Sequence, residues 1–115
     1  MTPRSDLPTW RSLMFVPTTK EAFIAKAHTR GADAIILDLE DSIAPNEKEA
    51  ARRALPAAAK TVAQAGADVV VRINRPMEMS VPDIAAAIMP GVGALMLPKV
   101  MGPEHVKLLS EIVAV

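Results

Sequence analysis

Four short apolar runs alternate with helical patterns along the chain, and this alternation limits the possible folds more than any other feature. The runs that we expect to form strands are residues 12–16, 34–39, 68–73 and 94–97. The spacings between their centres at Phe15, Leu37, Val71 and Met96 are 22, 34 and 25 residues. Each interval has room for a helix, and strands joined through helices pair in parallel. The sequence therefore predicts an α/β fold of four consecutive βα units.

The first two helical regions have recognisable ends. We expect the first over residues 19–30, with Thr19 as its N-cap and Gly31 as the left-handed residue beyond its C-terminus. We expect the second over residues 46–65, where Pro56 should kink or divide the helix because proline removes one backbone hydrogen bond.

The last two helical regions are shorter. We expect one over residues 80–89 with Ser80 as its N-cap, and one over residues 103–113. In the last region, the spacing predicts three residues on the buried face: Val106, Leu109 and Val113.

Length and composition exclude several classes of protein. The 115 residues suit one domain, which we place at residues 11–115, after an N-terminal tail at residues 1–10. The 13 basic and 13 acidic residues cancel, which argues against a nucleic-acid or membrane partner. No cysteine is present, so disulfides, zinc thiolates and a cysteine nucleophile are excluded. No apolar run approaches the roughly 20 residues of a membrane span. We therefore expect a cytoplasmic protein.

Polar residues follow the carboxyl end of every predicted strand. In parallel α/β folds these ends lie on one rim, where ligands bind. The rim residues with a possible role in chemistry are Lys20, Asp38, Glu40, Asp41, Arg72 and Lys99.

Each of these residues has both a structural and a functional interpretation. Asp38 follows an apolar run and should be partly buried, and with Glu40 and Asp41 it could order the water shell of Mg²⁺ or form a solvated turn. Arg72 could pair with Asp38, bind a substrate carboxylate, or do both. Lys20, Lys26 and Lys99 could each bind an anion or lie on the surface by chance.

Several of these segments together resemble the HpcH/HpaI aldolase and citrate lyase beta-subunit family. The matching segments are Arg11–Pro17, Lys26-Ala27, Gly31–Pro45, Val71–Asn74 and Leu97–Val100. The resemblance implies the N-terminal half of a TIM (β/α)8 barrel, that is, a (βα)4 segment. It also implies a Mg²⁺-dependent carbon–carbon lyase that acts on a citryl-CoA- or malyl-CoA-like thioester or on a 2-oxo acid, although some members are thioesterases.

The resemblance also implies roles for individual residues. Arg72 matches the catalytic arginine that contacts the substrate's carboxylate or carbonyl. Phe15, Lys20, Lys26 and Lys99 would bind substrate or line the mouth of the CoA site. The acidic motif of Asp38, Glu40 and Asp41 would lie near the metal's water shell.

Two departures from the family pattern affect these expectations. After the first strand, Pro17 is followed by Thr18, Thr19 and Lys20, where many members have glycine after the proline. The direct metal ligands, a Glu and an Asp, are expected beyond Val115, so we assign none within this chain. We therefore expect the isolated chain to be weakly active or inactive.

Two alternatives come from other functional classes. One is a truncated, non-catalytic paralogue or interaction module that associates with itself, since an incomplete barrel leaves two strand edges unpaired. The other is a flavodoxin-like regulator with an acidic rim. For the lyase we expect a homo-oligomer. Its ligand would be a small-molecule substrate, either an acyl-CoA or a 2-oxo acid.

Overall fold

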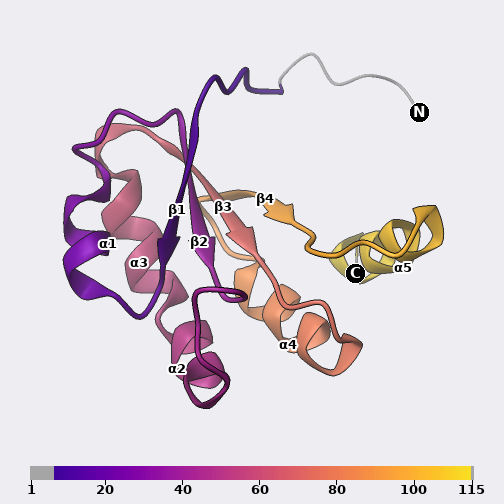
Figure 1. The fold of residues 1–115 in the computed structure, drawn as a ribbon. Helices are drawn as coiled ribbons and strands as arrows, with labels where there is room; N and C mark the ends of the chain where they lie inside the picture. Colours follow the sequence, from indigo (N-terminus) through magenta and orange to yellow (C-terminus); the bar gives the residue numbers. More distant parts are fainter. Residues whose placement is uncertain (1–6, 115) are drawn as a thin grey trace.

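The chain folds around one sheet of four parallel strands. The computed structural model describes residues 7–114. The strands are β1 (Leu13–Pro17), β2 (Ala34–Asp38), β3 (Asp68–Arg72) and β4 (Val92–Met96). They lie side by side in the order β1-β2-β3-β4, as Figure 1 shows.

The strand order distinguishes between the two architectures that the sequence left open. A flavodoxin-like sheet has the order 2-1-3-4-5, with its first strand between the second and third. Here each strand pairs with the next one along the chain, as successive units of a barrel do. The flavodoxin-like alternative is therefore wrong, and the (βα)4 barrel segment is confirmed.

Five α-helices follow or connect the strands. They are α1 (Glu21–Ala27), α2 (Lys48–Arg53), α3 (Leu55–Val62), α4 (Met77–Ala87) and α5 (Pro103–Ala114), with short 3₁₀ turns at Pro45–Glu47 and Ala63–Ala65. No helix between residues 7 and 114 is long and apolar enough to cross a membrane.

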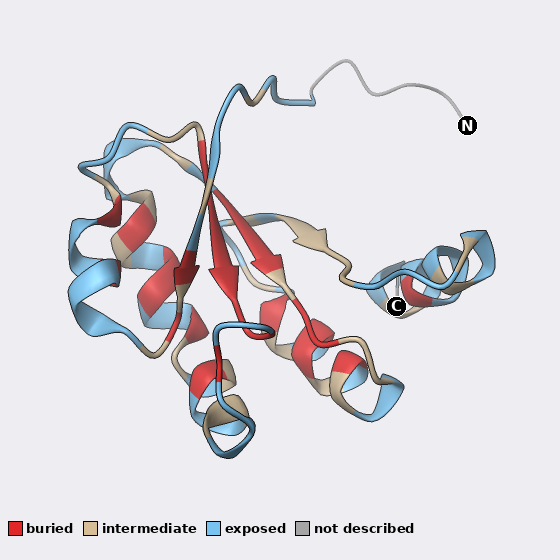
Figure 2. Cartoon of the chain, viewed as in Figure 1, coloured by how far each residue is buried: buried red, intermediate tan, exposed pale blue. Residues whose placement is uncertain are grey.

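The helices cover one face of the sheet. On that face alternate strand residues such as Leu37 and Val71 pack against helix residues such as Val62. On the opposite face Ile36 and Val70 form a smaller cluster with other strand residues and Trp10. Figure 2 shows the buried residues concentrated in β1–β3 and on the sides of the helices that face them. The opposite face corresponds to the interior of a barrel.

The second helical region is divided as Pro56 predicted. Ala54 separates α2 from α3, and Pro56 lies in the first turn of α3, where its missing N–H would have no partner in the helix. Gly66 follows the region with a left-handed φ of 98°.

Two predicted N-caps are wrong. Lys20, not Thr19, precedes α1, and this helix ends at Ala27 before a turn that leads to Gly31. Helix α4 starts at Met77, so that Ser80 lies inside it. The buried Ser80 hydroxyl donates to the carbonyl of Asn74 at 2.6 Å, a bond to the preceding loop that the helical pattern could not reveal.

Helix α5 contacts the rest of the chain through less of its surface than its pattern predicted. Leu109 is buried, but Val106 and Val113 are 43% and 45% exposed. These two valines line a hollow of about 480 Å³ between α5, β4 and the end of α4. The edge of β4 is therefore only loosely covered within the described residues.

The predicted tail is described only in part, since residues 1–6 lie outside the described residues. Trp10, within the predicted tail, donates its indole N–H to Asp68 Oδ2 at 2.7 Å and packs against the inner-face cluster.

Gly66→Ala should lower the free energy of unfolding by about 1 kcal/mol, because a Cβ disfavours the left-handed backbone. Gly93→Ala in β4 is the matched control, since its φ is ordinary and the nearest atom to an added Cβ is 3.9 Å away. Urea unfolding of both variants measures the difference. Equal effects would contradict the assignment of the Gly66 turn.

Candidate functional site

An ion pair joins the carboxyl ends of β2 and β3 on the inner face of the sheet. Asp38 and Arg72 are register partners, so their side chains leave the sheet on the same side. Arg72 Nε donates to Asp38 Oδ1 and Arg72 Nη2 donates to Asp38 Oδ2, each at 2.8 Å. This two-bond geometry fixes the plane of the guanidinium.

Asp38 is completely buried and its two oxygens accept further hydrogen bonds. The backbone N–H groups of Glu40 and Ser42 donate to it at 2.9 Å each, and the Ser42 hydroxyl donates at 2.6 Å. Burial alone would raise the pKa of Asp38, but the bonds from Arg72 and Ser42 lower that pKa well below its usual range. Asp38 is therefore an ionised carboxylate whose task is to hold Arg72 and the following turn.

Arg72 is held on a second side by an aromatic ring. Its guanidinium carbon lies 4.3 Å from the centre of the Phe15 ring, within the range of a cation–π interaction. The hydrogen bond to Asp38 raises the pKa of Arg72. Its Nη1 atom donates to no atom of residues 7–114 that accepts hydrogen bonds. The site thus presents a fixed, charged guanidinium with an open edge.

Glu40 lies next to this guanidinium and is only 7% exposed. Its Oε2 pairs with Lys99 Nζ. Its Oε1 lies 3.4 Å from Arg72 Nε but has no hydrogen-bond partner within the described part of the chain. A buried carboxylate oxygen in this state favours a donor from a ligand or water.

Lys99, which follows β4 in the chain, pairs with two carboxylates of the site, Glu40 and Asp41. Its ammonium lies 3.1 Å from Asp41 Oδ1. Hydrogen bonds to Glu40 and Asp41 raise the pKa of Lys99, and the bond from Lys99 lowers the pKa of Asp41. The φ of Lys99 is 49°, a left-handed value that is costly for a residue with a Cβ and is found mostly at functional positions.

Two supporting residues were missed by the sequence analysis. Lys48 donates its ammonium to the carbonyls of Leu39 at 3.2 Å and Glu40 at 2.5 Å. Asn74 donates its side-chain amide to the same Leu39 carbonyl at 3.0 Å. Asn74 stood within a segment that carried the family resemblance, which was a usable signal; nothing in the sequence distinguished Lys48 from a surface lysine.

The structure brings together six of the eight predicted site residues. Asp38, Glu40, Asp41, Arg72, Lys99 and Phe15 form one connected group. Lys20 and Lys26 are exposed at the two ends of α1, and neither forms an ion pair with a described residue. Lys26 and Phe15 line a separate hollow of about 420 Å³ between β1 and α1.

Thr18 stands where many family members have glycine, yet its backbone does not need glycine. Lys99 is the only non-glycine residue with a positive φ among residues 7–114. The Thr18 side chain is buried and its hydroxyl donates to the Asp38 carbonyl at 3.5 Å. This loop therefore packs onto the site in a way that a glycine could not.

The carboxylates present do not form a complete metal site. Among residues 7–114 no three Asp, Glu, His or Cys side chains come close enough to hold a metal ion. Both Asp38 oxygens are occupied, which leaves Glu40 Oε1 and the exposed Asp41 as acceptors. These acceptors suit the water shell of a divalent cation more than its direct coordination.

Comparisons with known proteins point to one family. A family model described as HpcH/HpaI aldolase/citrate lyase matches residues 11–115. The citrate lyase subunit beta of Leuconostoc mesenteroides subsp. cremoris is 38% identical over 94 residues, which are 78% of this chain and 30% of that protein. A (3S)-malyl-CoA thioesterase of Cereibacter sphaeroides is 33% identical over 105 residues, which are 90% of this chain and 37% of that protein.

A solved structure gives the same result. The citrate lyase beta subunit of M. tuberculosis, complexed with oxaloacetate and magnesium, matches with a TM-score of 0.64 and 33% identity. The match covers 85% of this chain and 42% of that one. The chain spans about a third of the length of the curated relatives it matches.

Asp38→Asn should lower the free energy of unfolding by about 3 to 5 kcal/mol, because it leaves the Arg72 charge beside a neutral amide in a buried position. Glu49→Gln is the control: it removes the exposed pair with Arg53 and should change stability little. Urea unfolding near neutral pH measures both. Similar small losses would show that the Asp38 pair does not hold the site.

Acid should weaken the wild-type chain more steeply than Asp38→Asn. The pKa of Asp38 is lower in the folded chain than in the unfolded chain, where it is about 3.9. The stabilisation from its charge is therefore complete above the unfolded pKa and is lost as the pH falls below that value. Urea unfolding at a series of pH values from about 7 to about 3 tests this. Parallel curves for wild type and variant would rule out the contribution.

Proposed function

Because this chain belongs to the HpcH/HpaI aldolase/citrate lyase family, we propose that the protein carrying it is a Mg²⁺-dependent carbon–carbon lyase. Its substrate would be a citryl-CoA- or malyl-CoA-like thioester or a 2-oxo acid. The names of the relatives support this class of substrate, and the M. tuberculosis neighbour was solved with oxaloacetate and magnesium. We also propose a cytoplasmic location and a homo-oligomer.

The observation that carries the proposal is the fixed guanidinium of Arg72 with its open Nη1 edge. Asp38 and Phe15 restrict the guanidinium to one orientation, so binding a ligand would cost little side-chain entropy. A planar, permanently charged donor suits the carboxylate or carbonyl of a 2-oxo acid. In this proposal Arg72 orients the substrate and stabilises negative charge near its carbonyl oxygen.

The residues present fit a supporting role toward Mg²⁺. Glu40 Oε1 and Asp41 would accept hydrogen bonds from the waters around the ion. Bound Mg²⁺ would polarise the substrate carbonyl as a Lewis acid. Its direct ligands, a Glu and an Asp, would come from outside these residues. Lys99 would hold Glu40 and Asp41 in place through its ion pairs.

The remaining predicted residues would serve the thioester. Phe15 and Lys26 line one hollow beside β1, and Lys20 lies exposed at the start of α1. We propose that these residues line the mouth through which a CoA substrate enters. Thr18 does not line this hollow, since its buried side chain lines another hollow beside α1 and α3.

A non-catalytic module that associates with itself remains the second candidate. The inner face leaves Leu13 and Phe15 40% and 48% exposed, and β1 and β4 are the two edges of the sheet. Sedimentation of the chain at several concentrations would test this function. A monomer at every concentration would count against it.

Arg72→Lys in the protein as encoded should lower kcat/KM by about 100-fold or more, since a lysine cannot offer the same planar edge. The assay would follow cleavage of citryl-CoA and malyl-CoA with Mg²⁺ present, separating the acyl-CoA and 2-oxo acid products from free CoA. Arg53→Lys is the control, because among residues 7–114 Arg53 forms an ion pair only with the exposed Glu49. It should retain wild-type kinetics.

The products distinguish the outcomes. An acyl-CoA and a 2-oxo acid would support the lyase, whereas free CoA and the intact acid would indicate a thioesterase. No turnover of either thioester by the encoded protein, with Mg²⁺ supplied, would contradict the proposal.

A further inference from the structure

A third buried carboxylate, Asp83, lies behind the site on α4. Asp83 is 1% exposed and none of the predicted roles used it. Its Oδ2 accepts the backbone N–H of Asn74 at 2.9 Å and the Asn74 side-chain amide at 2.7 Å. Its Oδ1 pairs with Arg52 Nε of α2 at 2.9 Å. Asp83 therefore ties α4 to the loop after β3 and to α2.

Asn74 also links Asp83 to the loop that follows β2. Its side-chain amide also donates to the Leu39 carbonyl at 3.0 Å, and the Leu39 N–H donates to the Arg72 carbonyl at 3.0 Å. Leu39 directly precedes Glu40, and Arg72 lies two residues before Asn74. Two hydrogen bonds thus lead from Asp83 to the peptide that joins Leu39 and Glu40, and a third leads from Leu39 to the carbonyl of Arg72.

Packing alone does not require a charge at this position. Helix α4 already buries Ile84 and Ala87 against the sheet. A buried carboxylate is costly unless it is fully bonded, and apolar residues often replace such groups without loss of stability. The hydrogen bonds to Asp83 fix the directions of the backbone N–H and side-chain amide of Asn74, which an apolar contact could not do.

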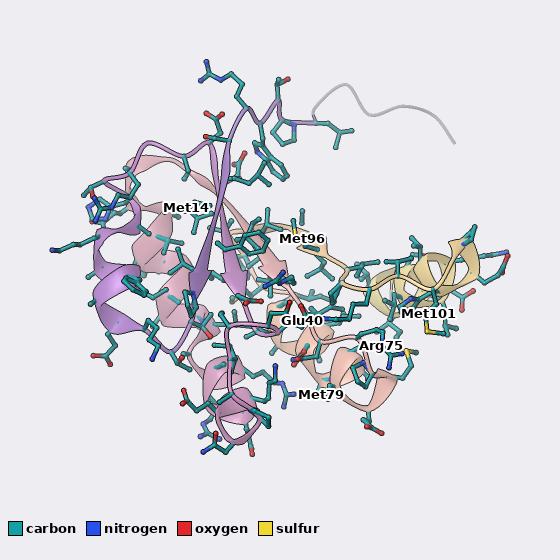
Figure 3. The ribbon with its side chains drawn as sticks, in the orientation of Figure 1. Met14, Glu40, Arg75, Met79, Met96 and Met101 are labelled. Carbon is teal, nitrogen blue, oxygen red and sulfur yellow. The ribbon has the colours of Figure 1, made fainter. Side chains whose placement is uncertain are left out.

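We propose that Asp83 is a positioning residue, which acts through Asn74 to hold the loops after β2 and β3 at the separation that places Glu40 beside Arg72. The inference rests on the proposed lyase function for its effect on catalysis. Arg52 pairs with the other oxygen of the carboxylate, Oδ1, and does not itself reach the Leu39 or Asn74 atoms in this chain of bonds. Figure 3 shows Glu40, Arg75 and Met79 near the carboxyl ends of β2 and β3, where these loops meet.

Three variants of the encoded protein separate positioning from stability. Asp83→Leu removes the acceptor for both Asn74 bonds, and Asn74→Ala removes the bond to the Leu39 carbonyl. Arg52→Met removes the ion pair but leaves the bonds between Asp83 and Asn74, so it is the matched control for lost stability. Urea unfolding would rank the stabilities, and all assays would use conditions in which every variant is folded.

Kinetics give the first readout. Asp83→Leu and Asn74→Ala should each lower kcat by about 10- to 100-fold, and the double variant should lose no more than either single variant. Arg52→Met should keep kcat within about threefold even if it is the less stable protein. A kcat loss that follows stability across the three variants would overturn the proposal.

Hydrogen exchange of the Arg72 Nε–H, followed by NMR, gives a readout that does not need activity. Exchange should be slow in wild type and Arg52→Met, and faster in Asp83→Leu and Asn74→Ala, because the Asp38–Arg72 geometry loosens. Unchanged exchange in Asp83→Leu would overturn the positioning role. If wild type shows no turnover, the lyase proposal fails, while the exchange measurement still decides the role of Asp83.

Discussion

The ion pair between Asp38 and Arg72 organises the whole carboxyl end of the sheet. Two buried charges are favourable only when nearly all of their hydrogen-bonding groups are satisfied. Asp38 meets this condition through Arg72, Ser42 and the Glu40 backbone. The same bonds link adjacent strands, turn the guanidinium over Phe15 and shape the loop that carries Glu40. The same ion pair therefore stabilises the fold and sets the geometry of the site.

The fold explains why the site is open on one side. Helices cover only the outer face of the sheet, and the inner face carries Arg72 together with apolar residues that are partly exposed. The matched segment is only about a third of the length of the relatives. In the proposed enzyme the metal ligands would come from outside these residues, while this chain would supply the charged groups that orient the substrate.

The sequence predicted those features that follow from local patterns. Apolar runs predicted the four parallel strands, and Arg72 within an apolar strand left its pairing with Asp38 as one of the open alternatives, which the structure shows. Pro56 predicted the division between α2 and α3. Each of these features depends on residues close together in sequence or on neighbouring strands of a repeating pattern.

The features that were missed depend on contacts between distant loops. Ser80 resembles an N-cap in sequence, but its hydroxyl bonds to the loop before the helix. The pairing of Lys99 with Glu40 joins residues 59 positions apart. Asp83 and Asn74 acquire their roles only through the Leu39 carbonyl. Val106 and Val113 follow a buried pattern, yet the hollow beside β4 leaves them exposed within the described residues.

A crystal structure of the encoded protein with oxaloacetate and Mg²⁺ tests the central claim most directly. The account predicts a carboxylate or carbonyl oxygen of oxaloacetate within about 2.7 to 3.2 Å of Arg72 Nη1, with the Asp38 pair intact. Oxaloacetate bound away from Arg72, or bound only after the Asp38–Arg72 pair has opened, would contradict it.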